Sequence, residues 1–169
     1  MNLMDVLKAT NGGQNIETFA NQFGISGDQA QSVLGQLLPA LAQGAQQNSG
    51  IEGLLGALSS GRHSQYIDDP STLSQPETIA DGNGILGHLL GSKDASRALA
   101  SQVAGNTGLS DVLIKQMLPV VASLAMGAMS KQTQTSASPL EGIAGMLGFD
   151  KDGSAVDDVM GLVGKLFNR

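Results

Sequence analysis

The chain has no cysteine and no tryptophan, and aromatic residues make up only 3% of its 169 residues. Without cysteine there can be no disulfide, no thiolate metal ligand and no cysteine nucleophile. A core with so few rings must be built from leucine, valine, alanine and methionine, which suits packed helices better than a sheet sandwich. The composition therefore predicts an all-α fold with few strands.

Basic residues are also scarce. Nine Lys and Arg against fifteen Asp and Glu give a formal net charge of −6, and Lys8 is the only base in the first sixty residues. A nucleic-acid or anionic-membrane partner normally requires the opposite balance. The charge therefore disfavours both kinds of partner.

Long apolar runs are missing as well. The uncharged apolar run between Lys115 and Lys131 spans fifteen residues, fewer than the ~20 that cross a bilayer as a helix. We expect it to form a buried helix. The opening MNLMDVLKAT lacks the apolar core of a signal peptide, so we expect a cytoplasmic protein with no transmembrane segment.

An internal repeat organises what is present. The segment GQLLPALA, ending at Ala42, recurs as KQMLPVVA, ending at Ala122, so Pro39 and Pro119 stand 80 residues apart. The same offset superposes FANQF on LASQV upstream, and IEGLLGAL returns downstream as LEGIAGML. A repeat of this length indicates one structural unit made twice.

We predict an all-α array of about eight to ten short helices, with the two proline-containing helices central and one core shared by both copies. The chain divides into a first repeat (1–58), a connector (59–82), a second repeat (83–129), a flexible polar linker (130–139) and a C-terminal helical segment (140–169) that packs with the repeats. The connector contains Pro70 and Pro76 and little periodicity, which is typical of an ordered or semi-ordered loop.

The clearest helices are predicted by spacing and capping. One runs from Ile16 to Phe23 and ends at Gly24, and Ser26 with Gln29 forms a capping box for the next. The apolar stripe of that second helix is Ala30, Val33, Leu34, Leu37, Leu38 and Leu41. Pro39 inside the stripe predicts a kink or a break. A last helix begins at a capping box of Ser154 and Asp157.

Three apolar segments carry regularly spaced glycines, at 50–56, 84–91 and 142–148. Glycine inside a helix costs ~1 kcal/mol relative to alanine, so these glycines need a reason. We expect close approach to a neighbouring backbone. The alternative is a self-association or partner face, for which the candidate residues are Gly84, Leu86, Gly87, Leu90, Leu54 and Leu55.

Residues 16–37 also match the small and apolar positions of a helix-turn-helix, which would place its second helix in a DNA groove. That helix, from Gly27 to Gln43, offers Asp28 and no Lys or Arg. Since phosphate neutralisation supplies most of the affinity in such complexes, nucleic-acid binding is kept only as the alternative function.

No catalytic or metal-binding pattern stands out. His63 and His88 are the only histidines and lack ligand spacing, and no nucleophile elbow, phosphate loop or dinucleotide fingerprint is present. The stretch DKDGSAVDD, from Asp150, lacks the glycine position and the terminal glutamate of a calcium loop. We therefore expect no catalytic residues, no cofactor and no metal.

Three segments carry a family resemblance: GNGILGHLLGSKDASRALA from Gly82, QMLPVVASLAMGAMSKQ from Gln116, and DGSAVDDVMGLVGKLF from Asp152. In these the chain resembles the YidB-like family of small bacterial proteins. The resemblance implies an all-helical bacterial protein of the cytosol and supplies no catalytic residues. The sequence predicts a non-enzymatic module for protein interaction or assembly, with an unknown partner or a second copy.

Overall fold

The computed structural model describes residues 3–48, 56, 58–59 and 63–135, and every regular element in these ranges is helical. The all-α prediction is confirmed. The order is α1 (Leu3–Ala9), a 3-10 turn η1 (Thr10–Gly13), α2 (Gln14–Phe23), α3 (Gly27–Asn48), α5 (Gln65–Asp68), η2 (Pro70–Ser74), α6 (Pro76–Leu90), α7 (Lys93–Thr107) and α8 (Asp111–Thr135). The predicted C-terminal segment and its last helix, 140–169, lie outside the described residues.

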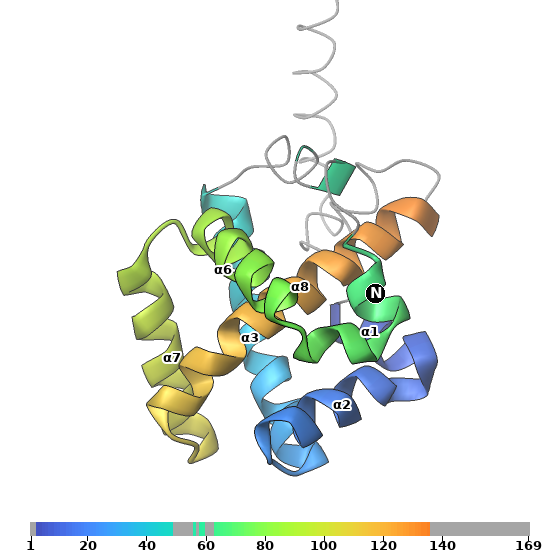
Figure 1. The fold of residues 1–169 in the computed structure, drawn as a ribbon. Coiled ribbons are helices and arrows are strands. Elements are labelled where there is room, and N and C mark those ends of the chain that lie inside the picture. Colours follow the sequence, from blue (N-terminus) through green and yellow to red (C-terminus); the bar gives the residue numbers. More distant parts are fainter. Residues whose placement is uncertain (1–2, 49–55, 57, 60–62, 136–169) are drawn as a thin grey trace, which may run out of the picture.

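The helix α8 is the centre of the fold. Figure 1 shows it crossing the middle of the molecule, and it contacts α6, α7, α3, α5 and α1. Every residue from Met117 to Ser130 is buried. A helix that is apolar on all sides is stable only when other elements surround it. The uncharged run therefore forms a buried helix, as predicted.

By length and composition alone, one stretch of α8, Asp111–Gln134, could cross a membrane, because its mean hydropathy reaches 1.6. Within the fold, 78% of its most apolar window is buried. The core helix of a folded protein meets the same criteria, since other helices satisfy its apolar surface in place of lipid.

The predicted helix boundaries around Gly24 are confirmed. Gly24 ends α2 in a left-handed conformation, and its amide donates to the carbonyls of Ala20 and Asn21. The capping box then forms: the amide of Gln29 donates to the Ser26 hydroxyl at 3.2 Å, and the amide of Ser26 donates to Gln29 Oε1 at 3.1 Å. The predicted stripe of α3, from Ala30 to Leu41, is buried along its length.

The prolines do not end their helices. Both α3 and α8 continue for at least two turns beyond Pro39 and Pro119, so of the two outcomes predicted at Pro39, a kink or a break, the break does not occur. A proline deletes one backbone hydrogen bond. The buried apolar side chains on both sides, such as Leu38 and Leu41 in α3, hold the helix together in spite of that loss.

Two stretches expected to be loops are partly helical. Residues 59–82 contain α5, η2 and the first half of α6. Pro70 and Pro76 lie in the first turn of η2 and α6, where a missing amide proton costs nothing. In the stretch 130–139, α8 continues to Thr135. Polar composition had indicated a linker there, but the helix simply leaves the core and keeps its backbone bonds.

The repeat corresponds to two similar helix pairs, α2 with α3 and α7 with α8. In each pair a left-handed glycine ends the first helix, and a serine two residues later caps the second: Gly24 with Ser26, and Gly108 with Ser110. The turns stand 84 residues apart and the prolines 80, which differs by about one helical turn. Descent from one duplicated unit stays a prediction.

A single cluster of buried apolar side chains joins both pairs. Its largest fully buried members come from α1, α2, α3, α5, η2, α6 and α8, and include Leu7, Phe19, Leu34, Ile67, Leu73, Leu89 and Met117. The two predicted repeats therefore share one core in the described part of the chain.

Candidate functional site

The helix α6 has one face in the core and one in solvent. Its buried residues, among them Gly82, Ile85 and Leu89, lie against α8 and α3. The opposite face consists of exposed residues at helical spacing: Ile79, Ala80, Asn83, Gly84, Gly87 and His88. We call these six residues the α6 outer face. These six residues include no Asp, Glu, Lys or Arg, although the exposed Glu77 lies beside them in the first turn of α6.

The glycines of α6 have two different environments. A Cβ placed on Gly82 would overlap the carbonyl oxygen of Pro119 and lie 2.6 Å from its carbonyl carbon. A Cβ on Gly84 or Gly87 would meet no atom within 4 Å in the described chain. Within the described residues, Gly84 and Gly87 therefore do not provide the expected close approach to a neighbouring backbone. Gly82, which lies outside the spaced motif, has that role.

Close packing recurs where α3 meets the end of α6. A Cβ on Gly44 would lie 3.3 Å from the carbonyl carbon of Leu89 and 3.1 Å from Leu90 Cδ2. Asn48 Nδ2 donates to the carbonyl of Leu89 at 3.2 Å, which satisfies one of the last carbonyls of α6. Small residues and one amide thus fix α6 against α3.

The predicted partner residues are separated by the fold. Gly84 and Gly87 lie on the α6 outer face, whereas Leu86 is buried and Leu90 packs against the core cluster. The two leucines follow the glycines in sequence, but 100° of helical rotation per residue turns them inward. Leu54 and Leu55 lie outside the described residues.

A polar cluster that the sequence did not predict joins α5 to α6. The Tyr66 hydroxyl donates to Asp81 Oδ2 at 2.5 Å, and His63 Nδ1 lies 3.5 Å from the same oxygen. The rings of His63 and Tyr66 have centroids 6.1 Å apart. Tyr66 and Asp81 are fifteen residues apart, and no motif connects them in sequence. Their pairing depends on how α5 packs on α6.

Burial, the hydrogen bond to Asp81 and the charge of that carboxylate together raise the pKa of Tyr66 to about 12. A phenol with such a pKa stays protonated and acts as a donor. The cluster contains no serine or cysteine that a base could activate. We therefore assign it a structural role, in which Asp81 orients Tyr66 and fastens α5.

The stability of the chain should fall at alkaline pH because of Tyr66. Its pKa is about 12 when folded and about 10 when unfolded, so the contribution is complete below pH ~10 and disappears as the pH rises toward ~12. Tyr66 is the only tyrosine and the chain has no tryptophan, so ultraviolet absorbance reports this phenol alone. Urea unfolding of Tyr66→Phe should lack the alkaline loss. A folded-state titration midpoint near 10 would contradict the prediction.

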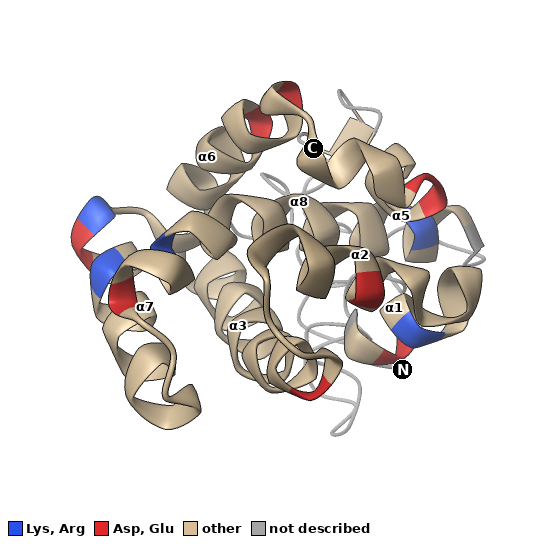
Figure 2. Ribbon diagram, turned by 60° about the horizontal axis from the view of Figure 1, so that its bottom comes forward, with Lys and Arg blue, Asp and Glu red and all other residues tan. Residues whose placement is uncertain are grey.

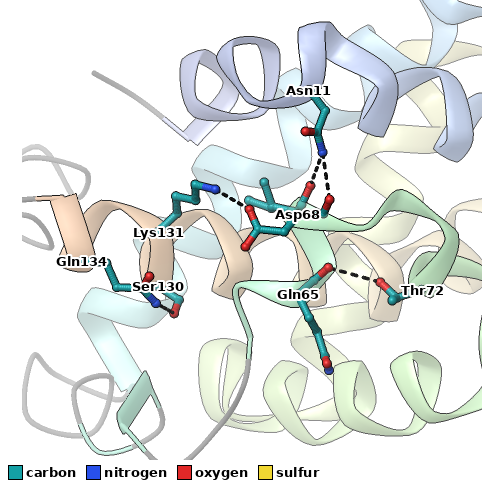
Figure 3. Close-up of polar contacts among 8 residues, drawn as sticks. Asn11, Gln65, Asp68, Thr72, Ser130, Lys131 and Gln134 are labelled. Atoms are coloured by element: carbon teal, nitrogen blue, oxygen red, sulfur yellow. Dashed lines mark hydrogen bonds and ion pairs between the residues drawn. The ribbon is translucent and has the colours of Figure 1, made fainter.

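A second polar cluster connects η1 to α5 and α8, as Figure 3 shows. Asn11 Nδ2 donates to the carbonyl of Ile67 at 2.8 Å and to that of Asp68 at 3.2 Å. The Asp68 carboxylate pairs with the ammonium of Lys131 at the end of α8. Three segments far apart in sequence are therefore held at one point.

Charges are dispersed over the described surface. Figure 2 shows the Lys and Arg positions as short segments of the ribbon, most of them near an acidic position. Arg97 pairs with Asp94, and Lys115 pairs with Asp111, whose pKa is lowered by Lys115 and by the Ser101 hydroxyl. Among residues 3–48, 56, 58–59 and 63–135, no three His, Asp or Glu side chains gather as a metal site would require. The 150–158 loop lies outside these ranges.

The helix-turn-helix segment does fold as two helices joined by a tight turn, α2 and α3. The exposed residues of α3 include Asp28, Gln29, Gln31, Ser32 and Gln43, and no residue of this helix is basic. Gln36 accepts a hydrogen bond from Asn106 of α7. The geometry of the motif is present, while the cations that would bind phosphate are missing from this helix.

Comparison with known proteins gives a match to one protein family. A family model described as bacterial protein of unknown function (DUF937) matches residues 5–132. No curated protein and no solved structure matches the chain. The matched range begins two residues into α1, ends three residues before the end of α8 and contains all the described helices between them.

Proposed function

The chain belongs to the DUF937 family of bacterial proteins of unknown function, the YidB-like family that its sequence resembles, and we propose that it is a non-enzymatic helical module for protein interaction or assembly. The observation that carries the proposal is the α6 outer face. In a chain whose residues are 14% charged, six exposed positions along one helix carry no formal charge. Exposed helix faces normally carry charged side chains.

Gly84 and Gly87 strengthen the argument. Each costs ~1 kcal/mol of helix stability relative to alanine, and neither makes room for another part of the described chain. A glycine on an outward face lets another backbone approach closely. The small residues Ala80, Gly84 and Gly87 lie beside Ile79, which is 38% exposed. Such a surface is better suited to packing against a partner helix than to exposure to solvent.

The test replaces Gly87 with leucine and measures association by sedimentation equilibrium over a wide range of concentrations. We expect the wild-type chain to self-associate and Gly87→Leu to weaken association about tenfold or more, because a bulky side chain prevents close approach. The melting temperature should not fall, since Gly87 touches nothing inside the fold.

The matched control is Gly105→Leu. Gly105 is also an exposed glycine inside a helix, and a Cβ on it would meet no atom within 4 Å. Association unchanged in this variant assigns the effect to the α6 outer face. A wild-type chain that stays monomeric at every concentration, or equal losses in both variants, would remove self-association from the proposal.

Nucleic-acid binding, the alternative, has the support of the helix-turn-helix geometry alone. The helix α3, which would be the recognition helix, contains Asp28 and no basic residue. Without several phosphate contacts even nonspecific affinity is lost. The interaction module is therefore the function we favour.

A further inference from the structure

The turn between α1 and α2 has an unusual backbone. Asn11, Gly12 and Gly13 lie one after another in the left-handed region, with φ of 53°, 60° and 85°. Residues of L chirality enter this region singly and at a cost, and glycines lose much conformational freedom when they are fixed there. Such a turn persists only while its surroundings hold it. Because the conformation of this turn depends on the contacts around it, the turn can act as a hinge.

The helix α1 on one side of the turn depends on the body of the fold. It has seven residues, too few to be stable alone, and it packs on α8, α2 and α3. Among its described side chains, Val6 and Leu7 are buried and Met4 is partly buried. Because α1 buries far fewer apolar side chains than α8, it should open at a lower free energy than the body of the fold.

Asn15, on the other side of the turn, makes the closed arrangement costly. Its side chain is fully buried, yet neither Nδ2 nor Oδ1 has a hydrogen-bond partner in the described part of the chain. A buried amide without partners loses its hydration and gains nothing in return. Any movement that admits water to Asn15 regains that free energy.

A polar contact at the turn opposes the opening. The Asn11 side chain lies in the hinge itself and donates two hydrogen bonds to the end of α5, whose Asp68 is in turn paired with Lys131 of α8 (Figure 3). Asparagine suits this position because it tolerates the left-handed region better than other residues with a side chain.

From these four observations we propose that α1 is a strap that detaches from the body as a unit, turning about Asn11–Gly13, and that Asn11 is its latch. Opening uncovers the apolar surface of α3 and α8 beneath Val6 and Leu7. The device is independent of the α6 outer face, so each proposal can fail without the other.

Native-state hydrogen exchange with increasing urea tests the strap. The amides of Leu7, Lys8 and Ala9 should exchange through an opening that depends little on urea, and at least a hundredfold faster, relative to intrinsic rates, than amides in the middle of α8. Exchange of α1 amides only at the rate of the α8 amides would overturn the proposal.

Two substitutions with opposite expected effects on hydrogen exchange in α1 extend the test. Asn11→Gly keeps the left-handed backbone and removes the latch, so exchange in α1 should rise about tenfold, with α8 little changed. Asn15→Leu removes the buried unpaired amide, so exchange in α1 should slow. Asn106→Ala, which deletes another exposed asparagine contact far along the chain, is the control. A rise in all helices alike for Asn11→Gly, or equal effects of Asn11→Gly and Asn106→Ala on α1, would show that Asn11 is no latch.

Discussion

Replacing Gly82 with alanine should destabilise the chain by about 3 kcal/mol or more, the upper part of the range for overpacked cores. The added methyl group would meet the backbone of Pro119, not a flexible side chain. Backbone cannot move aside by rotamer change, so α6 and α8 would have to separate. These two helices form the largest interface in the fold. Urea denaturation followed by circular dichroism measures the loss.

Gly84→Ala is the matched control, two residues further along the same helix. Its methyl group meets no atom of the described chain, and alanine favours the helix, so this variant should gain about 0.5–1 kcal/mol. The two substitutions are chemically identical and are expected to differ in sign. Equal effects would mean that α6 does not pack on α8 as the structure describes.

Replacing Phe19 with alanine should cost about 3–5 kcal/mol, the usual range for deleting a buried ring. Phe19 is fully buried, and its ring centroid lies 5.0 Å from that of Phe23. Because small domains are stable by only about 5–15 kcal/mol, the variant should be close to unfolding at ambient temperature. The ring fills space between α2 and its neighbours that no other aromatic side chain of the described residues can fill.

Phe23→Ala provides the comparison. Phe23 lies at the end of α2 and is only partly buried against the core, so the same truncation should cost clearly less, about 1–2 kcal/mol. Thermal and urea unfolding of the two variants should give the order wild type, Phe23→Ala, Phe19→Ala. If Phe23→Ala lost more stability than Phe19→Ala, Phe19 would not be the more deeply buried of the two rings.

Local chemistry was enough to predict the helices with clear end signals. Gly24, Ser26 and Gln29 fixed the boundary between α2 and α3, because each of these residues satisfies backbone groups within a few positions of itself. The buried stripe of α3 followed from the 3.6-residue period. At Pro39 local chemistry allowed a kink or a break, and the buried side chains on both sides exclude the break.

The candidate site could be predicted only in part. Sequence offered an interaction face on the glycine-spaced segment as the alternative to close packing, and the structure leaves Gly84 and Gly87 exposed. It could not tell which residues face inward, so Leu86 and Leu90 were assigned to the same face. The pairs Tyr66–Asp81 and Asn11–Asp68 had no signal, because hydrogen bonds between distant segments leave no spacing in a single chain.

By itself, the sequence determined the helical class, the caps, the apolar stripes and the buried character of the run that forms α8. These properties depend on composition and on neighbours within one or two turns. Only the tertiary structure decided that Gly82, and not Gly84 or Gly87, meets the backbone of Pro119, that Asn11 is tied to α5, and that Asn15 is buried without partners. Each of these depends on the positions of helices that meet far from one another in sequence, which chain-local energies do not fix.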